Sequence, residues 1–212
     1  MFARGTVPMA YVGPSFSSAV LATTNPNKIR EIRAMLDGVA MEIVGLDAFP
    51  AIAAPDETGA TFAENARLKA RYYSTATGMP AIAEDSGLEV EALDGAPGVE
   101  SARFAGADST YPEKFKALYS MLDARAGRES AARFVCALAV ASGEEILFEA
   151  RGTVEGRIAP EPRGTHGFGY DPIFFYPPEG RTLGEVSDDV KRAVSHRGAA
   201  FRRLKDWLRP AT

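Results

Sequence analysis

Two adjacent carboxylates, Glu84 and Asp85, follow the small apolar residues 81–83 and precede Ser86 and Gly87. Carboxylate oxygens in a cleft could bind a hard metal cation and take a proton from a water molecule. Side chains of successive strand residues point to opposite sides, so at most one of these acids faces a given pocket unless the chain turns. Taken alone, the pair is more typical of a solvated turn whose acids cap their own backbone.

The residues around this pair indicate how the chain positions it. The apolar run before the acids and the alternation after Gly87 predict a buried strand, a sharp turn and a second strand over residues 81–90. Gly87 supplies the backbone freedom that such a turn requires. Adjacent acids at the end of a buried strand are costly unless something cationic, such as a metal ion or basic side chains, meets them.

A polar turn after a predicted strand at residues 19–23 offers the first of these basic side chains. The turn consists of Thr24, Asn25, Pro26, Asn27 and Lys28. Asn25 fits a helix N-cap and Pro26 the first helical position, so the helix start presents backbone amides, with Lys28, to an anion. An ordinary strand–helix connection explains the same residues, and position alone favours that explanation somewhat.

A second basic residue, Lys69, lies on a helix predicted from a capping box at Thr61 and Glu64 to about residue 77. Asn65 and Lys69 are four residues apart on a face beside the apolar stripe. Another acid, Glu57, occupies the turn before this helix. Lys69 is therefore either a solvated surface lysine or a phosphate ligand at the edge of the core.

A glycine-rich loop at residues 164–172 carries Phe168 at its centre. Such a backbone suits close approach of a flat ligand, and a mobile surface loop is an equally good interpretation. A third basic residue, Lys191, follows in a short capped helical turn. Ser195 caps the last helix, with His196 and Arg197 in its first turn, where positive charge opposes the helix dipole. That placement favours an anionic or acceptor partner over a surface pair.

Composition bounds the class of protein. The chain has 212 residues, of which 46% are hydrophobic and 25% charged, and a net charge of −4, which argues against a broad nucleic-acid-binding surface. One cysteine, Cys136, permits no disulfide within the chain and indicates a reducing, cytoplasmic compartment. No run is long enough to span a membrane. We predict a flexible extension over residues 1–17 and a single domain over 18–212.

The order of predicted elements indicates an α/β fold with a mixed sheet. Strands and helices alternate up to residue 124, and a hairpin at Ser142 and Gly143 then joins two strands, at about 133–141 and 145–154. A hairpin makes its two strands antiparallel, so the sheet is not purely parallel.

Together the polar segments resemble the inosine triphosphate pyrophosphatase family, also called dITP/XTP pyrophosphatases. The resemblance runs from about Val20 to Leu208. It rests on six motifs in order: Thr23-x-Asn25-x-x-Lys28, Glu57-Thr58-Gly59-x-Thr61-Phe62-x-Glu64-Asn65-Ala66-x-x-Lys69-Ala70, Glu84-Asp85-Ser86-Gly87-Leu88, Gly95-x-Pro97-Gly98-x-x-Ser101-Ala102-Arg103, Gly167-Phe168-Gly169-Tyr170-Asp171-Pro172 and Ser195-His196-Arg197-Gly198. Each motif is weak alone, and six in order are specific.

The resemblance implies an α/β fold with an elongated mixed central sheet, flanked by helices and forming two lobes with the active-site cleft between them, in a homodimer. It also implies the reaction. With Mg²⁺, a nucleoside triphosphate that carries hypoxanthine or xanthine (ITP, dITP or XTP) is hydrolysed to its monophosphate and pyrophosphate. This clears deaminated purines from the precursors of DNA and RNA. Neither a membrane nor a nucleic-acid polymer is an expected partner.

The resemblance also implies roles for residues. Asp85 is expected to be the proton acceptor, Glu57, Asp85 and Glu84 to bind the metal, and Phe168 to stack on the purine. The substrate-binding residues implied are Thr23, Thr24, Asn25, Pro26, Asn27, Lys28, Lys69, Ser86, Phe168, Gly169, Tyr170, Asp171, Lys191, His196 and Arg197. Thr24 and Asn27 replace glycines of some members, and Glu84 replaces an aspartate of many.

Two other functions fit parts of the pattern. A related enzyme could cleave pyrimidine or modified nucleotides with the same carboxylates, but Phe168 and the Ser195-His196-Arg197 segment argue against it. A nucleotide sensor that does not hydrolyse its ligand would need no cluster of acids, whereas Glu57, Glu84 and Asp85 are all present.

Overall fold

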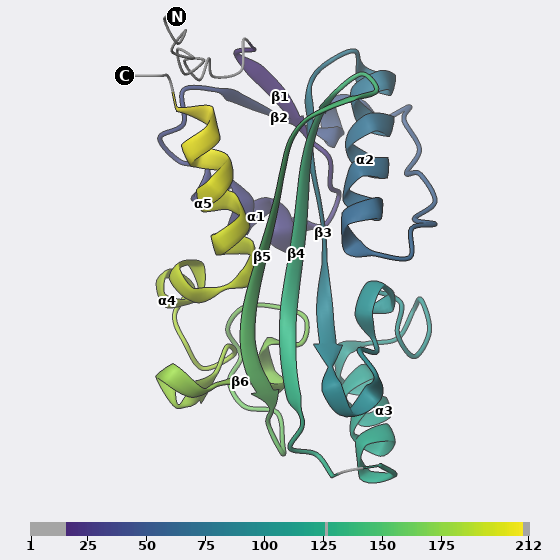
Figure 1. The fold of residues 1–212 in the computed structure, drawn as a ribbon, viewed down its shortest axis with the longest axis vertical. Helices are drawn as coiled ribbons and strands as arrows, with labels where there is room; N and C mark the ends of the chain where they lie inside the picture. Colours follow the sequence, from purple (N-terminus) through teal and green to yellow (C-terminus); the bar gives the residue numbers. More distant parts are fainter. Residues whose placement is uncertain (1–15, 126, 210–212) are drawn as a thin grey trace, which may run out of the picture.

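The computed structural model describes residues 16–125 and 127–209. The predicted extension at residues 1–17 therefore lies almost entirely outside the described residues. The helices in Figure 1 are α1 (Pro26–Met35), α2 (Phe62–Thr77), α3 (Tyr111–Asp123), α4 (Asp188–Val194) and α5 (His196–Leu208). The strands are β1 (Ser18–Leu21), β2 (Glu42–Gly45), β3 (Ala81–Val90), β4 (Ala131–Ser142), β5 (Glu145–Ile158), β6 (Phe174–Tyr176) and β7 (Arg181–Thr182).

The strands form one mixed sheet, as predicted, and their order in it is β2-β1-β3-β4-β5-β6-β7. β1 pairs in parallel with β2 and β3, and the remaining neighbours are antiparallel. β3 pairs with β4 along its whole length, from Ala81 opposite Ala141 to Val90 opposite Ala132. The predicted hairpin joins β4 to β5. These three long strands run along the elongated molecule in Figure 1.

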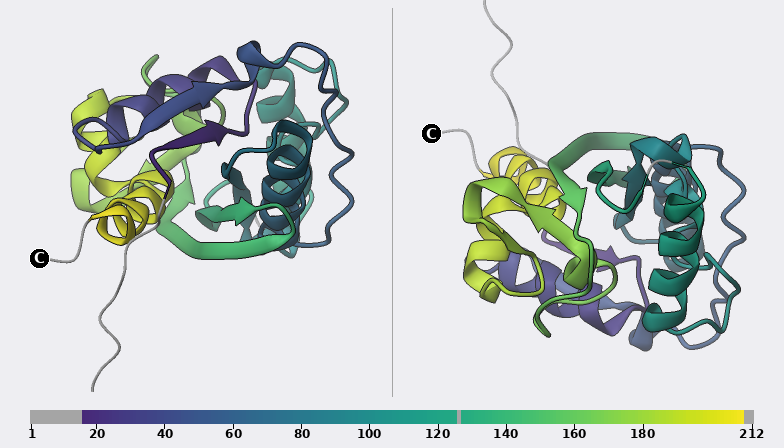
Figure 2. Two further views of the ribbon diagram at one scale, coloured as in Figure 1. Left: turned by 90° about the horizontal axis from the view of Figure 1, so that it is seen from above. Right: turned by 90° about the horizontal axis from the view of Figure 1, so that it is seen from below.

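Alternation along β3 and β4 gives the upper part of the sheet two apolar faces. Ala81 and Ala83 of β3 belong to a core cluster with the inner residues of α2. Ile82, between them, belongs to a second cluster with Phe201 and Leu204 of α5. Consequently α2 covers one face and α5 the other, as Figure 2 shows for a sheet that curls between them.

A third core cluster lies at the other end of the long strands, under α3. Phe115, Leu118 and Leu122 form the inner face of that helix and pack there with Leu88 of β3 and Phe134 of β4. β3 and β4 thus contribute to all three clusters and connect the two halves of the molecule. This arrangement confirms the predicted two-lobed α/β fold.

Helices α1 and α2 begin at the N-cap residues that the sequence predicts. Asn25 caps α1, with Pro26 at the first helical position. The capping box at Thr61 and Glu64 begins α2, and Gly78, at φ +70°, ends it.

The predicted turn in the carboxylate stretch is wrong. Residues 81–90 form one continuous strand, β3. Gly87 serves a close approach instead, because a Cβ at this position would lie 2.3 Å from Ser101 Oγ and 2.7 Å from the Gly98 carbonyl oxygen. The Ser101 hydroxyl accepts a hydrogen bond from the Leu88 amide at 2.9 Å, which fixes a loop against the strand.

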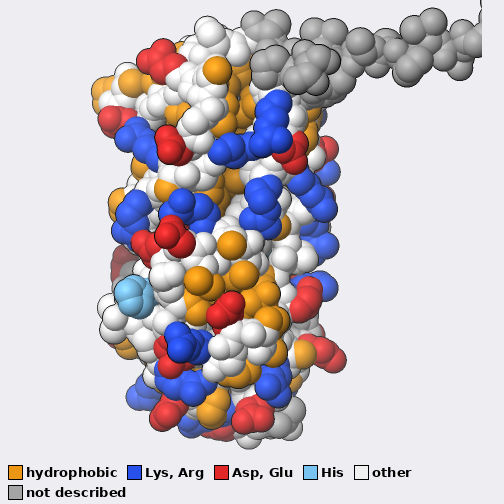
Figure 3. Space-filling model, turned by 90° about the vertical axis from the view of Figure 1, so that its left-hand side faces the viewer, with side chains coloured by type: hydrophobic (Ala, Val, Ile, Leu, Met, Phe, Trp, Pro, Cys, Tyr) orange, Lys and Arg blue, Asp and Glu red, His pale blue; other side chains and the backbone are white. Residues whose placement is uncertain are grey.

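Charges of both signs cover the surface that carries α4 and α5. Figure 3 shows Lys and Arg side chains on this face with Asp and Glu side chains among them. Among the helices of the described ranges, none has the length and apolar character needed to cross a bilayer.

Candidate active site

A cleft lies between the two halves of the molecule. It is lined by residues that are far apart in the sequence, from Asn25 to Arg197. Its wall includes Asn25 and Lys28 at the start of α1, the Phe168 loop, and the start of α5. The residues that line it are Asn25, Lys28, Glu57, Asp85, Ser86, Gly87, Val99, Ser101, Ala102, Tyr111, Phe134, Phe168, Gly169, Tyr170, Asp171, Lys191, His196 and Arg197. Twelve of these were predicted as site residues from the sequence.

Lys69 joins two of the predicted carboxylates behind this wall. Its ammonium lies 2.7 Å from Glu57 Oε1 and 3.3 Å from Asp85 Oδ1. The Lys69 side chain is only 10% exposed, so it is not the solvated surface lysine that its position allowed. Burial lowers the pKa of Lys69, but Asp85 and Glu57 outweigh burial and leave that pKa raised.

Burial also controls the ionisation of Asp85. It raises the pKa of this carboxyl above its ordinary value, while the neighbouring Lys69 ammonium opposes the increase and the Glu57 charge adds to it. A carboxylate with a raised pKa is a better proton acceptor than a free aspartate.

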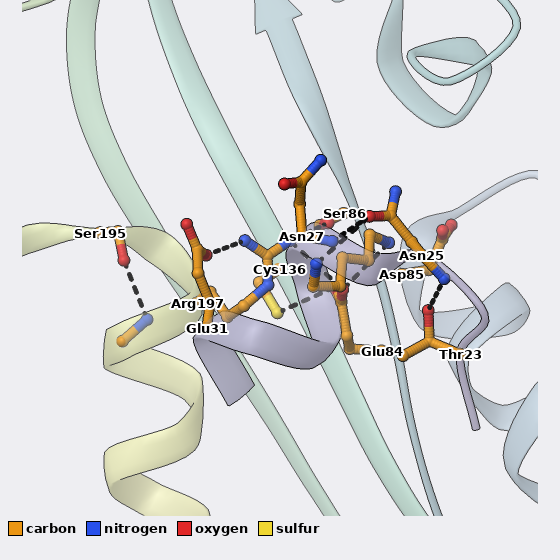
Figure 4. Close-up of polar contacts among 12 residues, drawn as sticks. Thr23, Asn25, Asn27, Glu31, Glu84, Asp85, Ser86, Cys136, Ser195 and Arg197 are labelled. Carbon is orange, nitrogen blue, oxygen red and sulfur yellow. Dashed lines mark hydrogen bonds and ion pairs between the residues drawn. The ribbon is translucent and has the colours of Figure 1, made fainter. Parts of the chain in front are cut away.

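Glu84 points to the opposite face of β3 and does not line the cleft. Its carboxylate lies 3.0 Å from Lys28 Nζ and 3.2 Å from Arg197 Nη2, and it accepts a hydrogen bond from Cys136 Sγ at 3.4 Å (Figure 4). Burial alone would raise the pKa of Glu84, but Arg197 and Lys28 together hold it well below its usual value. The adjacent acids thus point apart, as strand geometry predicts.

Arg197 and Lys191 meet at a carboxylate that sequence reasoning missed. Glu31 of α1 accepts from Arg197 Nη1 at 2.8 Å, as Figure 4 shows. It also accepts from Lys191 Nζ at 2.6 Å. Arg197 also donates to Ser86 Oγ at 2.9 Å. The one signal in the sequence is that Glu31 stands three residues after Lys28, on the same side of its helix.

The Phe168 loop is fastened to the same network. Asp171 Oδ2 accepts from the Phe168 amide at 2.7 Å and from Lys191 Nζ at 2.5 Å. Burial raises the pKa of Asp171, against the influence of Lys191. Lys191 Nζ and the Arg197 guanidinium lie 4.6 and 5.4 Å from the centre of the Phe168 ring. The ring is therefore held by cations and ordered beside the cleft.

Unpaired buried nitrogens concentrate at this end of the cleft. In the described parts of the chain, three buried side-chain polar atoms lack a hydrogen-bond partner: Arg163 Nε, His196 Nδ1 and Arg197 Nε. Two of them belong to cleft-lining residues. His196 stacks on Phe134 with ring centres 4.8 Å apart, and burial holds its pKa well below 6.5, so its imidazole is neutral. Such atoms are expected to meet a ligand.

The turn at the start of α1 satisfies its own amides. Asn25 Oδ1 accepts from the amides of Asn27 and Lys28 at 3.0 and 3.2 Å, and the Asn25 amide donates to Thr23 Oγ1 at 3.2 Å. These amides are therefore engaged within the chain, and the turn offers an anion chiefly the Lys28 ammonium. Four predicted substrate residues of this turn do not line the cleft: Thr23, Thr24, Pro26 and Asn27.

The sheet is mixed and curled, and its central cleft combines paired acids, lysines and a fixed aromatic loop. These features define an α/β protein whose cleft suits an anionic ligand with a flat ring. The model of the Ham1 family matches residues 19–207, nearly the whole chain. The chain therefore belongs to the Ham1 family, which confirms the resemblance found in its motifs.

Relatives cover almost the same length. A dITP/XTP pyrophosphatase of Symbiobacterium thermophilum is 49% identical over 192 residues, which cover 89% of this chain and 93% of that protein. A dITP/XTP pyrophosphatase of an Exiguobacterium species is 44% identical over 191 residues, 90% and 96% of the two chains. The solved structure of a HAM1 protein from Coxiella burnetii is 40% identical, with a TM-score of 0.84 over 90% of this chain and 98% of that chain.

Proposed function

We propose that this protein hydrolyses the triphosphates of deaminated purines (ITP, dITP and XTP) to the monophosphate and pyrophosphate. The observation that carries the proposal is the layout of the cleft. Acids and lysines around Asp85 suit a metal-bound triphosphate, and a fixed aromatic ring with unpaired nitrogens suits a base. Relatives named dITP/XTP pyrophosphatase at 44–49% identity support the same reaction.

The acids of the cleft fit a magnesium ion. Glu57 and Asp85 both contact the Lys69 ammonium, so their oxygens are close enough to share one cation. Within the described ranges, no three His, Cys, Asp or Glu side chains form a ready-made metal cage. Mg²⁺ keeps several waters and takes one or two carboxylates plus phosphate oxygens, so Glu57 and Asp85 suffice. When bound, it would neutralise phosphate charge and acidify water.

The chain's own residues would carry the remaining steps. Asp85 takes the proton of the attacking water, which the bound metal would make more acidic. Lys69, Lys28 and Lys191 supply positive charge to the triphosphate. Glu84 lies on the other face of β3 and, in this proposal, orients Lys28 and Arg197 without contacting the metal.

Base choice follows from hydrogen-bond donors beside Phe168. Hypoxanthine and xanthine carry an oxo acceptor where adenine carries an amino donor. Arg197 Nε is a donor, and His196 Nδ1 becomes one when that nitrogen carries the ring proton. An adenine amino group facing these donors would leave polar groups unpaired at roughly 1–3 kcal/mol each. Phe168 would hold the ring in their plane.

Product analysis tests the bond that is cleaved. Incubation of ITP with the protein and Mg²⁺, followed by ³¹P NMR, should show pyrophosphate and inosine monophosphate. Appearance of orthophosphate and inosine diphosphate would mean that the terminal phosphate is removed instead. Absence of any product would favour the sensor function over hydrolysis.

We also propose that the protein acts in the cytoplasm as a homodimer. Support for the compartment comes from Cys136, a buried free thiol and the one cysteine of the chain. Support for the dimer comes from the family resemblance.

A further inference from the structure

Asn65 is a fully buried polar residue of α2 that bridges two segments of the candidate active site. Its Nδ2 donates to Asp85 Oδ2 at 3.2 Å, and its Oδ1 accepts from the Gly59 amide at 2.8 Å. Its relative exposure is 0%. A buried amide with a partner at both ends is held in one orientation, so Asn65 can fix the position of whatever it contacts.

Lys69, one helical turn later, makes a parallel bridge. It contacts Asp85 through the other carboxylate oxygen, Oδ1, and it contacts Glu57 in the turn that also contains Gly59. Residues four apart lie on the same side of a helix, which explains why both reach the same carboxylate. α2 therefore holds each oxygen of Asp85 with a different side chain and ties both to the turn at residues 57–59.

At Gly59, which the Asn65 side chain contacts, there is no room for a side chain. A Cβ on Gly59 would lie 2.7 Å from Asn65 Oδ1 and 2.7 Å from Glu64 Cβ. The glycine thus allows its amide to reach the buried Asn65 side chain. The turn that carries the Glu57 carboxylate is consequently docked on α2 through Asn65.

We propose that Asn65 is a positioning residue that keeps Asp85 oriented when the triphosphate draws Lys69 away. The inference rests on the proposed function, in which Lys69 binds phosphate oxygens. An ammonium that takes up phosphate contacts weakens its hold on Asp85, whereas the neutral amide of Asn65 has no such attraction. Asn65 and Lys69 are the side chains that hydrogen-bond Asp85 in the described chain, so Asn65 then holds it alone.

Two substitutions and one matched control separate positioning from stability. Asn65→Ala removes both hydrogen bonds. Asn65→Asp keeps the size and the acceptor for Gly59, but replaces the donor to Asp85 with a like charge. Ser74→Ala is the control, because Ser74 is buried on the same helix and also bridges two segments, donating to the Met79 carbonyl at 2.7 Å and accepting from the Gly143 amide at 2.8 Å.

The measurements are kcat and KM for ITP, calorimetric affinity for a non-hydrolysable α,β-methylene analogue with Mg²⁺, and thermal unfolding. Loss of orientation at a reacting group costs up to about 10²-fold in rate, so we expect kcat to fall roughly 10–10²-fold in both Asn65 variants. Analogue affinity should stay within about threefold of wild type, because positioning acts after binding. The Tm of Asn65→Ala should match that of Ser74→Ala.

Three results would overturn the inference. One is a kcat in Asn65→Ala equal to that of Ser74→Ala. Another is a normal kcat in Asn65→Asp, which would show that the donor to Asp85 is unnecessary. The third is a parallel fall of kcat, analogue affinity and Tm, which marks a purely structural residue. If Asn65→Ala does not fold, the isosteric Asp variant decides. A wild-type protein that releases no pyrophosphate contradicts the proposed function itself, a result distinct from these three.

Discussion

At the scale of single residues, two neighbouring acids lie in different surroundings. Asp85 faces the cleft with a raised pKa, and Glu84 faces the opposite side of β3 with a lowered pKa. Burial favours the neutral form of both, but two cations contact Glu84 while Asp85 shares Lys69 with Glu57. The surroundings of the two acids, and not their residue type, therefore set the opposite directions of their pKa shifts.

Asp85→Asn should lower kcat by roughly 10²–10⁴-fold, the usual loss for a general base. The amide is isosteric and cannot accept a proton from water. Its Oδ1 can still accept from Lys69, but its Nδ2 would face the donor Nδ2 of Asn65, so some loss of Tm is also expected. Pyrophosphate release and thermal unfolding give the two readouts. Near-wild-type turnover in this variant would remove Asp85 from the mechanism.

His196→Ala and Arg197→Ala should reduce discrimination between ITP and ATP. Each removes a nitrogen that lacks a partner in the described chain, so kcat/KM should fall for ITP by roughly 5–150-fold and much less for ATP, the equivalent of 1–3 kcal/mol. Arg197 also binds Glu31 and Glu84, so its loss carries an added cost in stability. Equal losses for both nucleotides would show that these residues do not select the base.

At the scale of elements, buried ion pairs hold α1, β3 and α5 around the cleft. Glu84 of β3 contacts Lys28 of α1 and Arg197 of α5, and Glu31 links α1 to Arg197 again. These contacts join residues up to 166 positions apart in sequence. The cleft walls thus depend on charges that a local reading of the sequence does not connect.

Glu84→Gln should destabilise the fold by about 3 kcal/mol, the lower end for breaking a buried pair, because Arg197 retains Glu31. Since the folded-state pKa of Glu84 is well below 4.5, this stabilisation is present above pH 4.5 and is lost as pH falls through the folded-state value. Urea unfolding of both proteins at pH 7 measures this difference in the free energy of unfolding. The control is Glu149→Gln, whose exposed pair with Arg67 contributes about 0–1 kcal/mol. Equal effects of the two substitutions contradict this account.

The elements that the sequence predicts well depend on neighbouring residues. The Asn25 cap, the capping box at Thr61 and the hairpin at Gly143 involve residues at most four apart. The prediction of a turn at Gly87 was wrong because this glycine makes room for Ser101, which lies next to it only in the folded chain. Glu31 was missed for the same reason, since its partners Lys191 and Arg197 come from the far end of the chain.

At the scale of the whole molecule, the long strands β3 and β4 connect two lobes and place the cleft between them. The triphosphate end of the proposed site lies at Glu57 and Asp85, which Lys69 of α2 contacts, and the base end lies at the Phe168 loop and the start of α5. Substrate bound as proposed would touch both lobes, and its binding should stabilise the molecule as a unit.

The proposed homodimer predicts a mass twice that of the 22.6 kDa chain. Multi-angle light scattering after size-exclusion chromatography at micromolar concentration gives this mass without reference to shape. Dilution across the nanomolar range, followed by mass photometry, should show whether the pair dissociates. A single-chain mass at micromolar concentration would refute the dimer.

The central claim is selective pyrophosphate release from deaminated purine nucleotides. Its most direct test is kcat/KM for ITP, dITP, XTP, GTP and ATP, followed by pyrophosphate detection with and without Mg²⁺, with Asp85→Asn as the inactive control. We expect ITP, dITP and XTP to exceed ATP by roughly 10–10²-fold, consistent with one or two unpaired polar groups, and activity to require the metal. Hydrolysis of ATP as efficient as that of ITP, or no pyrophosphate from any of the five, would contradict the account.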